Sequence, residues 1–334
     1  MSFGRHRSVC LDTTDSLVFH GDMEQRVLGH SGISVGVIGF GAWQLNNPVW
    51  GGPDAQTSIR LVQAALASGC NFFDVAPGYG NGGSERLLGQ ALGQRRHEAV
   101  ICTKFGHGGP GGEDFSVAGL RTSLEGSLDR LQTDYVDVML LHNPAPDLLD
   151  ESKAADLYAE LTALQRAGKL RAFGASIDFA SDLRLLAETS SSQVAEVLFN
   201  AFLQDTRQAF PVARDNGVGL IAKVPLDSGW LSGKYGADSR FDGIRERWSK
   251  DDIARRAALV DKLRELLPAG IPLAQAALRF IVSHPEISTA IPGVKSEAQL
   301  ATNLAAAEAP LSPEITAAIH DLWEREIADN PLPW

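Results

Sequence analysis

The sequence predicts an α/β protein in which eight parallel strands close into a single-domain (β/α)8 TIM barrel with long mouth loops. Short runs of apolar and β-branched residues alternate with stretches in which apolar residues recur every three or four positions. The short runs are almost continuously apolar, which is typical of parallel strands buried on both faces. The predicted strands cover residues 35–40, 71–75, 100–105, 135–142, 172–176, 197–201, 219–224 and 289–293.

The segments between these strands have the helical spacing expected of the outer ring of a barrel. Two examples are the sets Ile59, Leu61, Val62, Ala65, Leu66 and Leu120, Leu124, Leu128, Leu131. No linker rich in proline, serine or charge divides the units, so we expect one domain over residues 23–334. Residues 1–22 show neither periodicity and are expected to form a flexible extension. The longest irregular stretch, residues 227–249, is expected to be a functional or disordered loop.

Composition excludes several classes of function. The formal net charge of −11 disfavours nucleic-acid partners, because such binding depends on lysine and arginine neutralising phosphates. The three cysteines, Cys10, Cys70 and Cys102, form no metal-type or CxxC pair, which fits reduced thiols in a cytoplasm. No apolar run approaches the roughly 20 residues that span a bilayer, and the N-terminus lacks a signal-peptide core. We therefore expect a soluble, cytoplasmic protein that does not bind membranes.

A doubly wound sheet with a Rossmann site is the architectural alternative. Residues 39–44, GFGAWQ, share only the first two glycines of the GxGxxG pattern. They are followed by Asn46, Asn47 and Pro48 rather than by a helix start, so the turn lacks the helix N-terminus that binds pyrophosphate in that fold. The barrel is therefore the better prediction.

Four polar residues follow or end consecutive predicted strands. Asp74 ends the second strand, Tyr79 lies in the loop after it, Lys104 is near the end of the third, and His142 ends the fourth. Each alone has an ordinary structural explanation, such as a cap, an ion pair or a satisfied buried histidine. Barrels place catalytic groups at the carboxyl ends of their strands, so the four together predict one active site.

The chemistry of these four residues is complementary. Reduction of a carbonyl by hydride needs a proton for the forming alkoxide, and Tyr79 is protonated at neutral pH because a phenol has a pKa of about 10. We expect the Lys104 ammonium to stabilise the phenolate and lower that pKa. Asp74 would hold Lys104 charged, and His142 would donate a hydrogen bond to the carbonyl oxygen. This scheme requires no metal.

Over residues 27–308 the chain resembles the aldo-keto reductase superfamily. The segments that carry the resemblance occur in order and are GFGAW (39–43), FFDVAPGYGNGGSERLLGQAL (72–92), TKFG (103–106), LLHNPAPD (140–147), GASIDFASDL (174–183), PLDSGWLSGKY (225–235) and IPGVKSEAQLATN (291–303). In that family the matching Asp, Tyr, Lys and His form the catalytic tetrad. The resemblance therefore implies the same roles for Asp74, Tyr79, Lys104 and His142.

The resemblance also implies that NADP(H), with NAD(H) as an alternative, binds extended across the barrel mouth. The matched positions near the nicotinamide and substrate are Gly41 and Trp43. Those at the carboxamide are Ser176 and Glu196, with Asn200 nearby. Those at the pyrophosphate are Leu226, Ser228, Gly229, Leu231 and Lys234. Those at the adenosine end are Gly293, Lys295, Gln299 and Asn303, which also form a helix start that suits an anion.

The chain departs from the family pattern at three of these places. Ser176 is followed by Ile177 where many relatives have Asn, which puts one carboxamide contact in doubt. Lys223 replaces an aromatic ring that many relatives place against the nicotinamide; its stem can pack on the ring or its ammonium can reach a phosphate. Gln299 replaces an arginine of NADP-selective relatives, but Lys295 lies four residues earlier, so we expect a modest preference for NADP.

The expected activity is that of an oxidoreductase acting on CH–OH groups, which interconverts an aldehyde, ketone or sugar-like carbonyl and its alcohol. Two alternatives remain at this point: an unrelated barrel isomerase, and a cofactor-sensing regulatory subunit, because the β-subunits of potassium channels resemble aldo-keto reductases. Four tryptophans fall in or near predicted mouth loops, where they either contact a substrate or pack the loops. They are Trp43, Trp50, Trp230 and Trp248.

Overall fold

A computed structural model describes residues 23–333 except 46, 48–50, 108–111 and 242–245. The expected extension at residues 1–22 and Trp50 therefore lie outside the described residues. Among the residues that the structure describes, no helix has both the length and the apolar character needed to cross a membrane.

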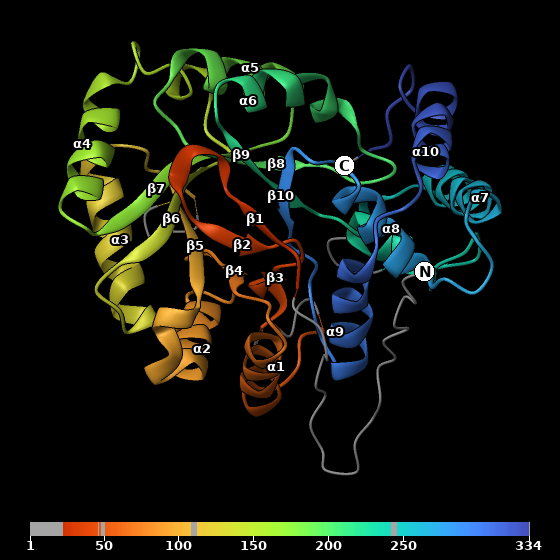
Figure 1. Ribbon diagram of the computed structural model, residues 1–334, viewed down its shortest axis with the longest axis horizontal. Coiled ribbons are helices and arrows are strands. Elements are labelled where there is room, and N and C mark those ends of the chain that lie inside the picture. The colour runs from red at the N-terminus through yellow and green to blue at the C-terminus, as the bar shows by residue number, and fades with distance from the viewer. Residues whose placement is uncertain (1–22, 46, 48–50, 108–111, 242–245, 334) are drawn as a thin grey trace, which may run out of the picture.

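Eight parallel strands form the barrel that the sequence predicts (Figure 1). In spatial order they are β3 (Phe40–Gly41), β4 (Phe72–Asp74), β5 (Val100–Phe105), β6 (Val136–His142), β7 (Leu170–Ile177), β8 (Val194–Leu198), β9 (Gly219–Lys223) and β10 (Ile287–Ala290). Isolated bridges between Ile38 and Ala290 and between Gly41 and Gly293 bring β10 beside β3. The predicted fold class is thus confirmed.

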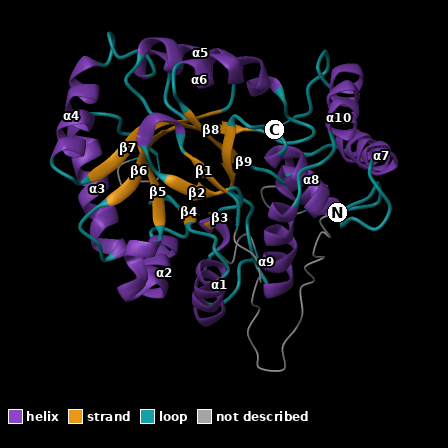
Figure 2. Ribbon diagram, viewed as in Figure 1, coloured by secondary structure: helices purple, strands orange, loops and turns teal. Residues whose placement is uncertain are grey.

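Helices surround the strands (Figure 2). The ring consists of α1 (Ala55–Ala67), α2 (Gly83–Leu92), α3 (Val117–Leu131), α4 (Ala155–Arg166), α5 (Ala180–Thr189), α6 (Phe210–Asp215), α8 (Leu273–Val282) and α9 (Glu297–Leu304). Side-chain caps begin several of them: Asp54 accepts a hydrogen bond from the Thr57 backbone amide (2.8 Å) and Ser116 accepts one from that of Gly119 (3.0 Å). The predicted apolar faces, such as Leu61 and Leu124, are buried against the strands.

The predicted strand at residues 35–40 is wrong as a single element. Its first part belongs to an antiparallel hairpin, β1 (Gln25–Val27) with β2 (Ser34–Gly36), and only its last residue belongs to β3. Ile33 and Val35 of this hairpin are buried in the same cluster as Phe72 and Val138 from the barrel strands. Because the hairpin closes the floor of the barrel, its residues are as apolar as those of a barrel strand, and the pattern did not separate them.

Two other predicted strands begin and end too late. The predicted strand 197–201 is β8, which ends at Leu198, and 289–293 is β10, which ends at Ala290. The apolar run continues past β8 because Phe199 and Ala201 are buried in the turn that follows. Burial therefore extends the hydrophobic pattern beyond the end of the strand pairing.

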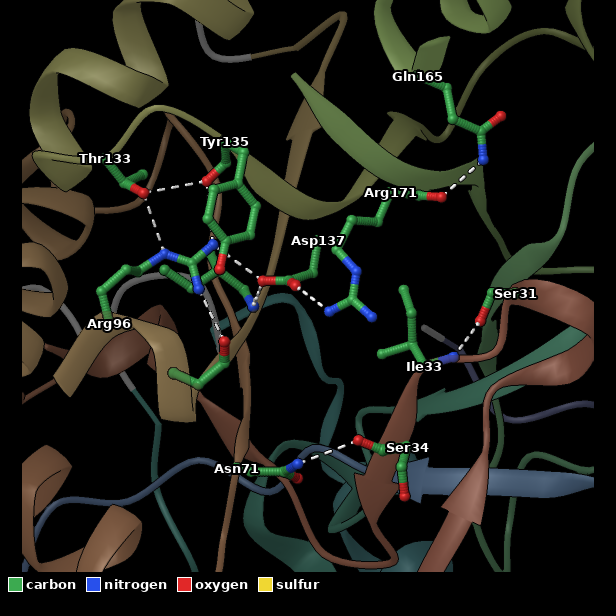
Figure 3. Close-up of polar contacts among 12 residues, drawn as sticks. Ser31, Ile33, Ser34, Asn71, Arg96, Thr133, Tyr135, Asp137, Gln165 and Arg171 are labelled. Atoms are coloured by element: carbon green, nitrogen blue, oxygen red, sulfur yellow. Dashed lines mark hydrogen bonds and ion pairs between the residues drawn. The ribbon is translucent and has the colours of Figure 1, made fainter. Parts of the chain in front are cut away.

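Buried polar residues also occur at the floor, where they join strands rather than form a site (Figure 3). The Asp137 carboxylate, near the start of β6, accepts hydrogen bonds from the Ile101 amide (2.9 Å), Arg96 Nη2 (2.9 Å) and Arg171 Nη1 (2.7 Å). In the same region the Asn71 side chain donates to the Ser34 carbonyl at 3.0 Å, which ties the hairpin to the barrel. Polar residues at the floor of the barrel are thus part of the scaffold, whereas those at the mouth are candidates for the site.

Two further helices, α7 (Lys250–Leu266) and α10 (Pro313–Glu326), lie side by side outside the ring (Figure 1). Lys262 on α7 pairs with Glu326 on α10 at 2.7 Å, and Arg255 Nη2 donates to the Glu326 carbonyl at 2.8 Å. Arg256, which is fully buried, donates to the Pro333 carbonyl at 2.6 Å and pairs with Asp227 in the loop after β9. The C-terminal segment is thereby connected to a loop at the barrel mouth.

Two histidines connect α10 to the barrel wall. His284 Nε2 lies 3.2 Å from His320 Nε2, His284 Nδ1 lies 2.9 Å from the Phe280 carbonyl, and His320 Nδ1 lies 2.6 Å from Gln204 Oε1. Burial lowers the pKa of both imidazoles, that of His320 to about 4, and the Arg207 guanidinium also disfavours their charged forms. Both rings are therefore neutral in the folded protein at neutral pH.

We predict that this pair makes the fold sensitive to acid. Because the folded-state pKa values lie below the unfolded value of about 6.5, the stabilisation is complete above that pH and is lost as the pH falls toward 4. Melting temperatures measured between pH 7 and pH 4 should fall less steeply for His320→Gln than for the wild type. His97→Gln, which changes an exposed histidine, is the control. Parallel curves for His320→Gln and the wild type would contradict the assignment.

Candidate active site

The carboxyl ends of three neighbouring strands bring the four expected catalytic residues together. Asp74 ends β4, Lys104 is the penultimate residue of β5, His142 ends β6, and Tyr79 lies in the loop between β4 and α2. Lys104 Nζ donates to the Asp74 carboxylate and lies 3.4 Å from the Tyr79 hydroxyl oxygen. The ring centres of Tyr79 and His142 are 6.4 Å apart. The phenol and the imidazole thus share one pocket wall.

The Lys104 ammonium is the electrostatic centre of this group. Burial alone would lower the pKa of Lys104, but the carboxylates of Asp74 and Glu196 outweigh burial and hold this pKa well above its usual value. For Tyr79 the balance is the reverse of the one expected from the sequence. Burial raises the pKa of the phenol above its usual value, and the nearby Lys104 charge lowers it by less than burial raises it. Tyr79 therefore carries its proton across the neutral range.

His142 is neutral for a similar reason. Burial, followed by the Lys104 charge, lowers the pKa of His142 to about 3. Its Nδ1 atom is buried and has no hydrogen-bond partner among the described residues. A neutral imidazole carries one N–H donor and one acceptor, so this side chain can orient an oxygen atom of a bound molecule without adding charge.

Glu196 contacts the lysine, a contact that the sequence did not predict. Its Oε2 lies 3.2 Å from Lys104 Nζ, and its Oε1 accepts a hydrogen bond from Ser176 Oγ at 2.9 Å. Burial would raise the pKa of Glu196, but the Lys104 and Lys223 ammonium groups lower it to about 2. Although Oε2 is within ion-pair distance of Lys104, its geometry satisfies no hydrogen bond among the described residues.

The Lys223 ammonium makes contacts that the sequence analysis did not consider. Its ammonium donates to Ser176 Oγ at 2.8 Å and Asn143 Oδ1 at 3.0 Å, and it pairs with Asp178 at 2.8 Å. Asn143 and Asp178 are site residues that the sequence analysis missed. They directly follow the ends of β6 and β7, so the rule that places functional groups at the carboxyl ends of strands would have indicated them.

One pocket of about 960 Å³ opens above these residues. Asp74, Tyr79 and His142 line it, whereas Lys104 is fully buried and is not part of the lining. Most of the expected cofactor residues also line the pocket, namely Gly41, Trp43, Ser176, Glu196, Lys223, Leu226, Ser228, Gly229, Lys234, Gly293, Lys295, Gln299 and Asn303. The structure therefore brings the two expected sets of residues to one cavity.

Two expected cofactor residues lie elsewhere. Asn200 is fully buried, and its side chain donates to the Val224 carbonyl at 2.9 Å and accepts from the Phe202 amide at 2.8 Å. Leu231 is fully buried in the main hydrophobic cluster. Neither lines the pocket, because the turn after β8 and the loop after β9 point these side chains into the packing beneath. Their expected places at the cofactor stay predictions that this pocket does not support.

The loop after β9 has an unusual backbone. Val224, Asp227 and Ser228 have φ values of 53°, 45° and 52°, in the left-handed region that a β-branched residue such as valine rarely adopts. The buried ion pair of Asp227 with Arg256 holds this conformation from below. Such strain persists only where the surroundings impose it, and it is concentrated at ligand sites.

The tryptophans divide into two groups. Trp230 and Trp248 are buried, with ring centres 5.8 Å apart, so they pack the loop after β9. Trp43 is 38% exposed, and its ring centre lies 4.5 Å from that of Tyr79. Of the three tryptophans in question that the structure describes, only Trp43 lines the pocket.

The pocket has features that fit a dinucleotide. Lys234, Arg247 and Lys295 line it, and cationic side chains of this kind suit phosphate groups. The start of α9 borders the same region through Ala298 and Gln299, where helix N-terminal amides favour an anion. The positive side chains and the helix start thus suit the phosphate groups of a dinucleotide.

Comparison with known proteins agrees with this arrangement. The model of the aldo/keto reductase family matches residues 37–324. A probable voltage-gated potassium channel subunit beta from Arabidopsis thaliana is 32% identical over 92% of this chain and 98% of its own length. Aldo-keto reductase YhdN from Bacillus subtilis is 30% identical over 93% of this chain and 97% of its own length. The holo form of an aldo-keto reductase from Bacillus halodurans has a TM-score of 0.77 and 27% identity, covering 90% and 96% of the two chains.

The family model covers most of the chain, and the two sequence relatives match nearly its full length at 30% identity or more. The chain belongs to the aldo/keto reductase family, which is a family of oxidoreductases.

Proposed function

We propose that the protein is an NADP(H)-dependent oxidoreductase that interconverts a carbonyl compound and its alcohol, with Tyr79 as the general acid and base. One observation carries the proposal: Tyr79 lines the pocket, and its hydroxyl oxygen lies 3.4 Å from the buried Lys104 ammonium. A phenol in this position keeps its proton until a neighbouring oxygen becomes basic. The ammonium then stabilises the phenolate that remains.

The residues of the chain divide the work of reduction. The bound cofactor supplies the hydride. Tyr79 donates its proton to the carbonyl oxygen, and neutral His142 orients that oxygen by a hydrogen bond. Lys104 stays charged because Asp74 and Glu196 compensate its burial, so it stabilises the Tyr79 phenolate. In the oxidising direction the phenolate accepts the alcohol proton.

The aromatic and polar side chains near Tyr79 and His142 suit a broad class of carbonyl compounds. Trp43 presents a partly exposed aromatic edge beside Tyr79, and the ring of His107 lies 5.8 Å from that of His142. Polar groups at Asn143 and Asp178 line the same mouth. We propose an aldehyde, ketone or sugar-like substrate, because aromatic and polar groups together suit apolar and hydroxylated chains.

The regulatory alternative is supported by the similarity to a potassium channel subunit beta. The four tetrad residues and the open pocket support turnover instead, because a pure sensor needs no positioned proton donor. A screen that follows NADPH absorbance with DL-glyceraldehyde, 4-nitrobenzaldehyde and simple ketones distinguishes the two. Turnover supports the enzyme, and NADPH binding without turnover supports the sensor.

We predict that Tyr79→Phe lowers turnover at least about a hundredfold, the usual scale for a positioned acid-base group. NADPH affinity, measured by fluorescence titration, should change little because the ring remains against Trp43. Tyr135→Phe is the matched control, since that tyrosine lies against Arg96 at the barrel floor. Near-normal turnover of Tyr79→Phe would remove Tyr79 from the mechanism.

Cofactor preference depends on the start of α9. Gln299, which stands in place of an arginine in NADP-selective relatives, uses its Oε1 to accept the Lys295 amide at 2.9 Å. Its side chain therefore caps the turn. Lys295 and Arg247 both line the pocket and provide positive charge for a 2′-phosphate. We propose a preference for NADPH of roughly ten- to thirtyfold, the scale of one exposed ion pair in addition to helix amides.

Lys295→Ala should reduce that preference severalfold by weakening NADPH binding while leaving NADH binding nearly unchanged. Dissociation constants for both cofactors, measured by fluorescence on the wild type and the variant, test this. Lys169→Ala, at the start of β7 on the barrel floor, is the control for the loss of a surface charge. Tighter NADH binding by the wild type, or an undiminished preference in the variant, would overturn the role of Lys295.

A further inference from the structure

We propose that Glu196 and Asp74 form a carboxyl pair that holds one proton beside Lys104, and that this proton replaces the one Tyr79 gives away during reduction. The proposal rests on the function proposed above. It makes Glu196 a positioning residue that acts through Lys104, which differs from the carboxamide contact implied by the family resemblance.

The geometry converges on a single ammonium. Lys104 Nζ donates to Asp74 Oδ1 and lies 3.2 Å from Glu196 Oε2. The nearest ligand atoms of Asp74, Glu196 and Cys102 all lie within 4.8 Å of one another. Asp74 and Glu196 come from β4 and β8, which are not neighbours in the sheet, so their side chains meet inside the barrel. Each is at most 3% exposed.

Charge counting requires a proton in this group. Two ionised carboxylates and one ammonium would leave a net negative charge in the barrel interior, and an uncompensated buried charge is costly. Lys223 does not cancel it, because its ammonium pairs with Asp178 at 2.8 Å. Two carboxyl groups that share a site do not both ionise readily. Burial, and then the Glu196 charge, raise the pKa of Asp74 well above its usual value, in agreement with a proton on the Asp74 side.

Ser176 fixes which side of the pair is ionised. Its hydroxyl donates to Glu196 Oε1 at 2.9 Å while accepting a hydrogen bond from Lys223 Nζ at 2.8 Å. The hydrogen bond from Ser176 and the nearby charge of Lys223 both favour the carboxylate form of Glu196. Asp74 has the Cys102 thiol beside it, and no described cation other than Lys104 pairs with it. The asymmetry of the surroundings therefore places the negative charge on Glu196.

The proton path is balanced at every step. Tyr79 gives its proton to the carbonyl oxygen as the carbonyl carbon receives hydride, which leaves a phenolate. The phenolate takes a proton from the Lys104 ammonium across 3.4 Å, and the resulting amine takes the proton of the Asp74 carboxyl group. Tyr79 and Lys104 are then restored, both carboxylates are ionised, and solvent returns one proton to the pair. One proton is consumed for each carbonyl reduced.

This arrangement also balances charge within the pocket. Reduction leaves one more positive charge at the cofactor, and the carboxyl pair becomes more negative by one charge in the same turnover. A site that retained its proton would have to accommodate the extra positive charge next to Lys104 and Lys223. The pair thus accounts for two carboxylates at a lysine that needs only one partner to stay charged.

Glu196→Gln tests the stored proton without any turnover. Infrared spectra of the ligand-free protein near neutral pH should show the C=O stretch of a buried carboxylic acid in the wild type. The band should disappear in Glu196→Gln, because Asp74 alone beside Lys104 ionises. Glu196→Asp keeps the charge and should retain the band. An unchanged band in Glu196→Gln, or no such band in the wild type, would overturn the proposal.

The pH dependence of turnover tests the use of that proton. The wild type stores a proton beside Lys104 that can replace the one Tyr79 gives away, whereas in Glu196→Gln the ionised Asp74 holds none. The alkaline limb of NADPH-dependent reduction of 4-nitrobenzaldehyde should move to lower pH by roughly one unit in Glu196→Gln and stay in place in Glu196→Asp. Superimposable profiles would overturn the role in turnover.

Two further results keep these tests separate from other causes. Thermal melts establish that each variant is folded. If Glu196→Gln does not fold, the comparison of Glu196→Asp with the wild type decides the question. If the wild type reduces no carbonyl compound, the proposed function fails, but the infrared band still decides whether the carboxyl pair holds a proton. The two failures are therefore distinguishable.

Discussion

A buried ammonium held by two carboxyl groups is the constraint on which this site depends. Lys104 is fully buried, and it retains its charge because Asp74 and Glu196 face it from two strands. Removal of one member of a buried ion pair typically costs about 3–5 kcal/mol, because the remaining charge is left without compensation. The side chains around Lys104 must therefore be placed together, and this requirement links the chemistry of the site to the geometry of the barrel.

The barrel meets that requirement because its two ends have different roles. At the floor, the hairpin of β1 and β2 closes the interior with apolar side chains, and Asp137 joins β5, β6 and β7 through backbone and arginine contacts. At the mouth, strand ends bring Asp74 and His142 to the wall of one pocket and Lys104 directly behind it. The floor carries the scaffold, so the mouth can hold ionisable groups and a strained loop.

The sequence predicted those parts of the site that depend on strand order. Asp74, Lys104 and His142 lie at strand ends, and neighbouring parallel strands must end at the same edge, so their convergence follows from the pattern. The contact of Glu196 with Lys104 does not follow, because it joins β8 to β5 through the interior, and no local pattern records it. The direction of the shift in the Tyr79 pKa was predicted wrongly for a related reason. Burial raises this pKa and the Lys104 charge lowers it, and only the packing determines which effect is larger.

Other differences between prediction and structure arise because buried residues have the sequence pattern of a strand or of a binding site without belonging to one. The apolar run at residues 35–40 contains part of a floor hairpin and part of a barrel strand, because both face the same interior. The resemblance led us to expect Asn200 and Leu231 at the cofactor, and in this structure their side chains pack beneath the mouth loops. Trp230 and Trp248 also pack inside the loop after β9. Periodicity and motif spacing do not distinguish a side chain that lines a pocket from one that lies behind it.

The most direct test of the account is Lys104→Met, which keeps the length of the side chain and removes the buried charge. Single-turnover oxidation of bound NADPH by 4-nitrobenzaldehyde should slow at least about a hundredfold, and its pH dependence should change because the phenolate loses its cation. NADPH affinity should stay within about threefold, since Lys104 is buried behind the pocket wall. A rate within about threefold of the wild type, with an unchanged pH profile, would contradict a mechanism centred on this ammonium.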